Sequence, residues 1–142
     1  SLWEAHQRVG LWTVPVPGGP AAVSRLKEMD YVLGVVSNAE GQVARDLDAA
    51  GYEQCFATVI DSHIVGVQKP DPRIFEIALE RLKADAERTI FVGDVPSVDV
   101  VGAQAAGIVP VLVDPHELFL DRELARVPSI RELPDLLIDE DS

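Results

Sequence analysis

Short, continuously apolar segments alternate with amphipathic segments along most of this chain, and this alternation constrains the fold more than any other feature. Tyr31–Val36, Thr89–Val92 and Ile108–Val113 are each long enough for one strand, and Phe56–Ile60 is a further short apolar run. Strands that are apolar throughout are buried on both faces, which is typical of a parallel sheet between two layers of helices. The sequence therefore predicts an α/β fold with a Rossmann-like parallel sheet.

The segments between the apolar runs carry helix signals. Pro20 is placed to open a helix, and Asp71 followed by Pro72 opens another with a capping carboxylate and a proline in the first turn. Glycines follow two further helical segments, at the position where helices commonly end. The expected helices cover residues 20–29, the segment from after Val36 to about Ala50, the segment after Asp71, residues 97–106 and a final turn at 133–138.

A cluster rich in proline and glycine, Val14–Pro20, interrupts the chain near its start. Such a cluster is typical of a linker or a sharp turn. We therefore expect two parts, a short segment over residues 1–15 and an α/β core over residues 16–142. The total of 142 residues fits one domain by size.

Composition excludes several classes of partner. Twelve basic against 24 acidic residues give a net charge of −12, so the phosphate backbone of nucleic acid would be repelled. The apolar runs are far too short to cross a bilayer. Cys55 is the single cysteine, so no internal disulfide is possible and we expect a reducing, cytoplasmic location. We expect neither nucleic acid nor a membrane as a partner.

Polar residues that could carry chemistry lie next to the predicted strands. Ligands of open α/β sheets bind outside the carboxyl ends of the strands. Ser37 and Asn38 follow the first apolar run, and Lys69 precedes a helix. Asp94 follows the strand at residues 89–92, and Asp99 comes five residues later. The lysine could bind phosphate, and the two carboxylates offer the oxygen ligands that a partly hydrated Mg²⁺ prefers.

Each of these residues also has a purely structural interpretation. Ser37 and Glu40 have the spacing of a capping box, and on spacing alone this interpretation is favoured. A lone lysine such as Lys69 is usually a solvated surface charge. Asp99 in the first turn of a helix would stabilise that helix through its dipole. Asp94 is the strongest single candidate, because it follows an apolar strand and a glycine that permits close approach.

Taken together, these segments resemble the haloacid dehalogenase-like hydrolase family, in its phosphatase-like branch. Their order, spacing and placement at strand ends are similar to the second, third and fourth motifs of that family. The resemblance covers about residues 16–137, and the three motifs are specific as an ordered set. The segments that carry it are Val35–Asn38, Lys69–Pro72 with Phe75, and Phe91–Asp94 continuing through Asp99 to Gly107.

The resemblance implies Mg²⁺-dependent hydrolysis of a phosphomonoester, with a small phosphorylated metabolite as the substrate. An aspartate nucleophile would form an aspartyl phosphate, and a second aspartate two residues later would act as acid and base. By match to the motifs, Ser37, Asn38 and Lys69 would bind the phosphoryl oxygens. Asp94 and Asp99 would bind Mg²⁺, which offsets charge on the transferring group.

The sequence departs from the family at the first motif, a strand that ends in Asp-x-Asp before Ser37. Asp46-Leu47-Asp48 lies within a predicted helix, and Asp139-Glu140-Asp141 lies in a polar tail. The core is therefore expected to lack its nucleophile-bearing central strand, with residues 1–15 a remnant of a helical cap and its return linker. A partner fragment, a segment swapped from another copy, or collapse of the neighbouring strands should fill the gap. We expect a homo-oligomer or a complementing N-terminal segment.

Two functions stay open. The chain is either the C-terminal portion of a phosphohydrolase, inactive without its nucleophile, or a non-catalytic interaction or regulatory module that kept the fold. A phosphoacceptor signalling domain uses similar groups but fits less well. Such a domain has its acceptor aspartate before the hydroxyl and the lysine, whereas Ser37 and Lys69 precede Asp94 here.

Overall fold

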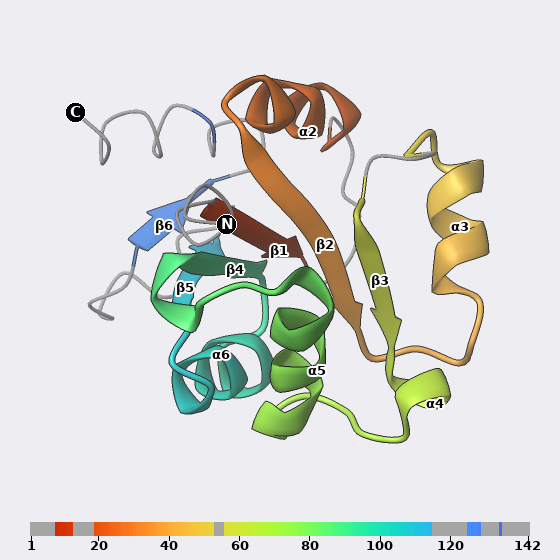
Figure 1. Cartoon of the computed structure of the whole chain (residues 1–142), viewed down its shortest axis with the longest axis vertical. Helices are drawn as coiled ribbons and strands as arrows, with labels where there is room; N and C mark the ends of the chain where they lie inside the picture. Colours follow the sequence, from red (N-terminus) through yellow and green to blue (C-terminus); the bar gives the residue numbers. More distant parts are fainter. Residues whose placement is uncertain (1–7, 13–18, 53–55, 115–124, 129–133, 135–142) are drawn as a thin grey trace.

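The computed structural model describes residues 8–12, 19–52, 56–114, 125–128 and 134, and it shows a six-stranded sheet flanked by helices (Figure 1). The strand order is β3-β2-β1-β4-β5-β6, and every pairing is parallel. The predicted α/β fold with a Rossmann-like sheet is confirmed. The strands are β1 (Arg8–Trp12), β2 (Tyr31–Ser37), β3 (Thr58–Asp61), β4 (Thr89–Gly93), β5 (Val109–Val113) and β6 (Ala125–Val127).

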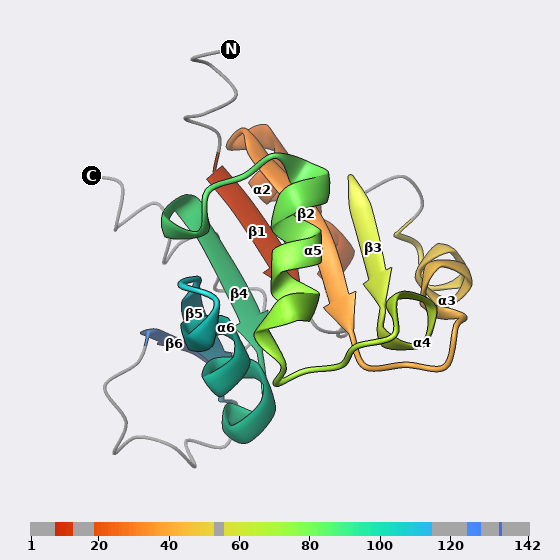
Figure 2. The same cartoon turned by 60° about the horizontal axis from the view of Figure 1, so that its bottom comes forward.

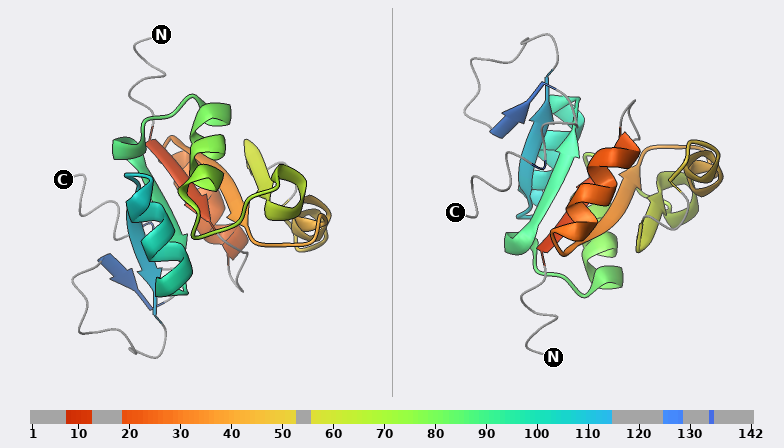
Figure 3. Two further views of the ribbon diagram at one scale, coloured as in Figure 1. Left: turned by 90° about the horizontal axis from the view of Figure 1, so that it is seen from below. Right: turned by 90° about the horizontal axis from the view of Figure 1, so that it is seen from above.

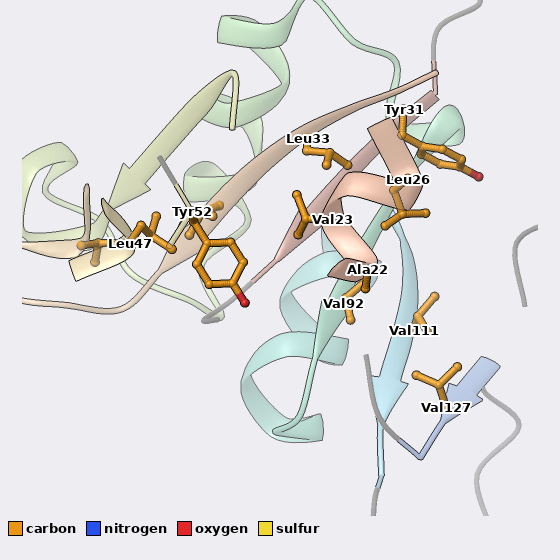
Figure 4. Packing of buried hydrophobic residues seen from close by; sticks show 12 residues of the cluster. Ala22, Val23, Leu26, Tyr31, Leu33, Leu47, Tyr52, Val92, Val111 and Val127 are labelled. Carbon is orange, nitrogen blue, oxygen red and sulfur yellow. The ribbon is translucent and has the colours of Figure 1, made fainter. Parts of the chain in front are cut away.

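Helices cover both faces of this sheet (Figures 2 and 3). Buried residues of α2 and α3 pack on one face, and those of α5 and α6 pack on the other. Figure 4 shows the first of these cores, where Val23 and Leu26 of α2 lie near Leu33 of β2. The helices are α2 (Gly19–Glu28), α3 (Val43–Ala49), α4 (Ser62–Val65), α5 (Pro72–Leu82) and α6 (Val101–Ala105), with a 3-10 turn at Ala86–Arg88 and a π-helical turn at Pro96–Val100.

Helix α5 forms where the sequence predicts it. The Asp71 carboxylate accepts a hydrogen bond from the Arg73 backbone N–H at 3.0 Å and thereby caps the first turn. Phe75 is fully buried, and its ring meets that of Phe91 in β4 edge-on at 4.8 Å between centroids. Helix α6 approaches closely at Gly102, because a Cβ there would lie 2.7 Å from the Phe75 ring. Helix α5 is thus fixed against β4, and α6 is fixed against α5.

Strand β1 lies in the middle of the sheet, between β2 and β4. Leu11 pairs with Gly34, and Gly10 pairs with Leu33. A Cβ on Gly34 would lie 2.9 Å from Leu11 Cδ2, and a Cβ on Gly10 would lie 3.2 Å from Leu33 Cδ2. Each leucine therefore lies over the glycine opposite it, on alternate faces of the sheet. This complementary packing fixes the register of β1 against β2.

The central position of the sheet is thus occupied by β1. The sequence predicts that a partner fragment, a swapped segment or strand collapse fills this position, whereas the structure fills it with residues 8–12 of the same chain. These residues belong to the core sheet, so the expected boundary near residue 15 does not separate β1 from the core. The origin of residues 1–15 as a cap remnant stays a prediction.

One local prediction is wrong. Ser37 and Glu40 do not form a capping box, because Ser37 is the last residue of β2, where it pairs with Asp61, and α3 begins only at Val43. The short elements α4 and β6 were not predicted. Residues 133–138, apart from Pro134, lie outside the described residues, as do Cys55 and the tail at 139–141. Within the described ranges, no helix has the length and apolarity needed to cross a bilayer.

Candidate active site

The candidate residues gather at the carboxyl edge of the sheet. β2 ends at Ser37, which is 2% exposed, and β4 ends at Gly93, directly before Asp94. β1 lies between these two strands and ends at Trp12, which pairs with Val35 on one side and Val92 on the other. Parallel strands bring their carboxyl ends to one edge, so residues distant in sequence meet there.

Asn38 joins the end of β2 to the segment before α5. Its side-chain amide donates to the Lys69 carbonyl oxygen at 3.1 Å, and its Oδ1 accepts from the Lys69 backbone N–H at 2.8 Å. One amide side chain therefore satisfies both backbone groups of the lysine. This pair of bonds fixes the Lys69 backbone beside Ser37.

Lys69 is buried, at 3% exposure, and its ammonium points to Asp99. Lys69 Nζ donates to Asp99 Oδ1 at 2.8 Å and lies 5.1 Å from the centroid of the Phe91 ring. Burial lowers the pKa of Lys69 below the ordinary value of 10.5, while the charges of Asp99 and Asp94 act in the opposite direction. The lysine is not a solvated surface charge, so the structural interpretation of it is wrong.

Asp99 connects Lys69 to the loop after β4. Its second oxygen, Oδ2, accepts from the backbone N–H groups of Asp94 and Val95, each at 3.0 Å. This approach requires glycine at position 93, because a Cβ there would overlap the Cβ of Asp99. Both oxygens of Asp99 are therefore engaged within the protein. The residue orients Lys69 and the backbone of Asp94.

The Asp94 side chain is exposed at the carboxyl end of β4. Its carboxylate is open to solvent at this edge, whereas the Asp99 oxygens already have three donors. Within the described part of the chain, no three side chains of histidine, cysteine, aspartate or glutamate gather as a metal site would need. A Mg²⁺ ion here would therefore depend on one carboxylate, water and substrate oxygens, a combination that Mg²⁺ accepts.

An open pocket of about 540 Å³ lies next to the segments around Asn38 and Lys69, and its lining includes none of the candidate site residues. Ala39 and Gln68 line it, and each is the sequence neighbour of a member of the Asn38–Lys69 pair. His63 and Arg73 also line it, although the Arg73 guanidinium forms an ion pair with Asp71 at 2.7 Å. The pocket gives room for a small polar molecule beside the segment that precedes α5.

Sequence reasoning missed three residues that shape this edge. Asp61 and Ser62 bond to the loop after β2, and Phe91 lies beneath the Lys69 ammonium. One signal in the sequence could have identified Asp61. It is a carboxylate that directly follows an apolar run, as Asp94 is. No pattern in the sequence identifies the Phe91 contact.

A parallel sheet whose carboxyl edge holds a buried ammonium and an exposed carboxylate defines an α/β protein with its polar candidate residues at one edge. The profile of the haloacid dehalogenase-like hydrolases matches residues 3–107. The chain therefore belongs to the haloacid dehalogenase-like hydrolase family.

Several known proteins are similar to this chain. It is 37% identical over 101 residues to a glyceraldehyde 3-phosphate phosphatase of Methanothermobacter thermautotrophicus, a match covering 70% of this chain and 45% of that protein. It is 32% identical over 135 residues to haloacid dehalogenase-like hydrolase domain-containing protein 3 of Mus musculus, covering 95% and 53%. The crystal structure of a phosphatase of this family from Thermococcus onnurineus superposes with a TM-score of 0.77 at 28% identity, covering 86% and 57%. The chain spans about half the length of the curated relatives it matches.

Proposed function

We propose that this chain forms the phosphate- and magnesium-binding part of a phosphomonoester hydrolase, and that without an aspartate nucleophile it does not turn over alone. The observation that carries this proposal is the buried Lys69, bonded through Asn38 to the end of β2 and through Asp99 to the end of β4. A buried cation held at the end of a parallel sheet suits a phosphoryl group. The phosphatases among the relatives support the reaction class.

In the proposed site, Ser37 and Lys69 bind the phosphoryl oxygens. The Ser37 hydroxyl and the Lys69 ammonium both donate hydrogen bonds, and a buried ammonium interacts more strongly with an anion than a solvated one does. Asn38 contributes by fixing the lysine backbone. Because these groups are ordered before the substrate arrives, the charge that develops on the transferring group meets donors already in place.

Asp94 would hold Mg²⁺ in this site. When bound, the cation would offset negative charge on the phosphoryl group. The sequence led us to assign Asp99 as a second metal ligand, but its oxygens accept from Lys69, Asp94 and Val95. We propose instead that Asp99 positions Lys69 and the Asp94 loop. The chain has a net charge of −12 and would repel a phosphate monoester, so a bound cation would favour binding of the substrate.

The chemical step itself needs a nucleophilic carboxylate other than those of the described site residues. In the intact protein, an aspartate oxygen would attack phosphorus, the ester P–O bond would break, and the leaving oxygen would take a proton from a second aspartate. Water would then attack phosphorus and give a proton to the second aspartate, while the bond between phosphorus and the nucleophile oxygen breaks, which releases inorganic phosphate and restores both aspartates. The substrate would be a small phosphorylated metabolite, as the name of the glyceraldehyde 3-phosphate phosphatase suggests.

One observation favours a second candidate, a non-catalytic interaction or regulatory module. β1 already occupies the centre of the sheet, and the sequence continues from Trp12 with Thr13 and Val14, neither of which bears a carboxylate. A protein built in this way would keep the anion site without the reaction. Both candidates predict phosphate binding, and they differ in whether a nucleophile is supplied.

Binding of orthophosphate and hydrolysis of p-nitrophenyl phosphate with Mg²⁺ test this proposal on the purified chain. We expect phosphate binding that Lys69→Ala weakens about tenfold or more, as for a charged hydrogen bond. Arg81→Ala is the matched control, because it removes the same charge from an exposed side chain outside the pocket lining and should leave binding unchanged. We expect no turnover above background.

Either of two outcomes would contradict the proposal. Turnover that Asp94→Asn abolishes would mean that the chain carries a nucleophile, and phosphate binding insensitive to Lys69→Ala would mean that the anion site lies elsewhere. The intact mass of the native protein, with the coding sequence upstream of Ser1, then separates the two candidates. An in-frame apolar strand ending in Asp-x-Asp supports the hydrolase, and its absence supports the module.

A further inference from the structure

We propose that Asp61, at the end of β3, is a positioning residue that holds the loop after β2 and, through it, the Asn38–Lys69 pair. This inference rests on the proposed phosphate site and extends it to a residue outside the family motifs described above. Asp61 is 2% exposed, although a buried carboxylate needs several hydrogen bonds to offset its lost hydration. Hydrogen bonds to the Asp61 carboxylate provide this compensation.

The Asp61 carboxylate accepts from three backbone N–H groups. Oδ2 accepts from Gly41 at 2.9 Å and from Val43 at 3.3 Å, and Oδ1 accepts from His63 at 2.9 Å. The His63 bond caps α4, whereas the other two reach across to the loop that follows the neighbouring strand. One side chain thus joins the carboxyl ends of β2 and β3.

Ser62 adds a second attachment to the same loop. Its hydroxyl accepts from the Ala39 backbone N–H at 2.9 Å and donates to the Ala39 carbonyl oxygen at 3.1 Å. The loop also fits closely against α4, because a Cβ on Gly41 would lie 3.3 Å from the His63 ring, and Gly41 has a φ of +104°. Residues 39–43 are therefore held at three points by Asp61 and Ser62.

Asn38 lies between these attachments and the candidate site. It precedes Ala39 directly, and its side chain bonds to both backbone groups of Lys69. Hydrogen bonds from Asp61 to the loop, the backbone of residues 38–41, and hydrogen bonds from Asn38 to Lys69, from Lys69 to Asp99 and from Asp99 to the backbone of Asp94 therefore form one connected path. Releasing residues 39–43 would let Asn38 move and would loosen the backbone of the lysine that binds phosphate.

The competing interpretation is that Asp61 acts only as the N-cap of α4. Asp61→Ser separates the two roles, because serine caps helices well but has one short oxygen that cannot also reach Gly41 and Val43. Thr89→Ala is the matched control for stability. Thr89 is also buried, and the substitution removes the hydrogen bond that its hydroxyl donates to the Asp85 carbonyl oxygen. It lies at the start of β4, at the opposite edge of the sheet from Asp61.

Amide hydrogen exchange by NMR is the first measurement. The backbone N–H of Lys69 donates to the Asn38 side chain. In Asp61→Ser we expect this N–H to exchange about fivefold to tenfold faster than in Thr89→Ala, the factor that corresponds to the free energy of one hydrogen bond. Orthophosphate affinity should fall by a similar factor in Asp61→Ser and remain unchanged in Thr89→Ala. Ser62→Ala, which removes only the Ala39 bonds, should show a smaller change in the same direction and serves if Asp61→Ser does not fold.

The outcomes are distinguishable. Faster exchange at Gly41 and Val43, with the Lys69 N–H unaffected, would overturn the proposal and leave Asp61 as a cap and loop anchor only. Faster Lys69 exchange with weaker phosphate binding would support it. If the wild-type chain does not bind orthophosphate, the proposed function fails, and the exchange rate of Lys69 still decides whether Asp61 positions that lysine.

Discussion

At the scale of single residues, the charge of Lys69 depends on two opposing effects. Burial removes water from the ammonium and lowers its pKa, whereas the carboxylates of Asp99 and Asp94 favour the charged form. Desolvation is the larger effect. The ammonium is therefore easier to deprotonate than that of an ordinary lysine, and its charge is maintained by its neighbours in the site.

This balance predicts a specific titration. The Lys69 side chain should titrate below 10.5, and Asp99→Asn should lower its pKa further, because a favourable charge is lost. Asp94→Asn should act in the same direction with a smaller effect. The measurement is the pH dependence of the Lys69 Cε resonance by NMR. An unchanged or raised midpoint in Asp99→Asn would contradict the assignment of Asp99 as its partner.

The same titration affects stability with a definite sign. Between the lowered pKa of folded Lys69 and the ordinary 10.5, the unfolded chain binds more protons than the folded chain. The free energy of unfolding contributed by this group therefore increases as pH rises through that window, and it is constant above 10.5. Lys69→Met should remove this increase when urea unfolding is followed across the same pH range.

At the scale of elements, the packing of β1 against β2 is directly testable. Leu11→Ala should cost about 2–5 kcal/mol through the cavity it leaves, and Gly34→Ala about 1–3 kcal/mol through overpacking. Because each change affects the same contact, the new Cβ at position 34 should partly fill the space left by Leu11. The double variant should therefore be destabilised by less than the sum of the two, as measured by urea unfolding. Additive costs would mean that Leu11 does not lie over Gly34.

The elements that sequence patterns could predict are those with strong local signals. β2, β4 and β5 are apolar runs, and α5 has both a cap and a first-turn proline. β1 has five residues, and its Gly10 interrupts the apolar pattern. Its place in the sheet depends on how Gly10 fits beneath Leu33, which is a tertiary contact. Helix α4 has only four residues, too few for a periodic pattern to appear.

The candidate site was predictable in its members but not in their connections. Strand-end placement identified Ser37 and Asp94, since parallel strands bring their carboxyl ends together, and Lys69 was identified by its position before the helix that Asp71 opens. That Asp99 faces Lys69 instead of standing open to a cation depends on the turn of residues 94–99. The capping box at Ser37 fails because of another tertiary contact. β2 extends one residue further than predicted, and Ser37 pairs there with Asp61.

At the scale of the whole molecule, β1 joins two parts of the sheet that share no other strand pairing. β2 and β3 lie on one side of it, and β4, β5 and β6 lie on the other. Amides of β1, β2 and β4 should therefore exchange only through global unfolding, while those of β3 and β6 at the sheet edges exchange through smaller openings. Hydrogen exchange at increasing urea concentrations measures this difference. Exchange of Leu11 as fast as that of the edge strands would contradict the central position of β1.

The bonds around Lys69 also determine when, during folding, the site can exist. Asn38 and Lys69 are 31 positions apart in the chain, and Lys69 and Asp99 are 30 apart. Contacts so distant in sequence form slowly, because long loops must close before any of these bonds can form. The proposed anion site therefore exists only once the segments that carry Asn38, Lys69 and Asp99 have come together. Phosphate would find its binding groups only on a chain in which these three segments already meet, and its binding would report that assembly.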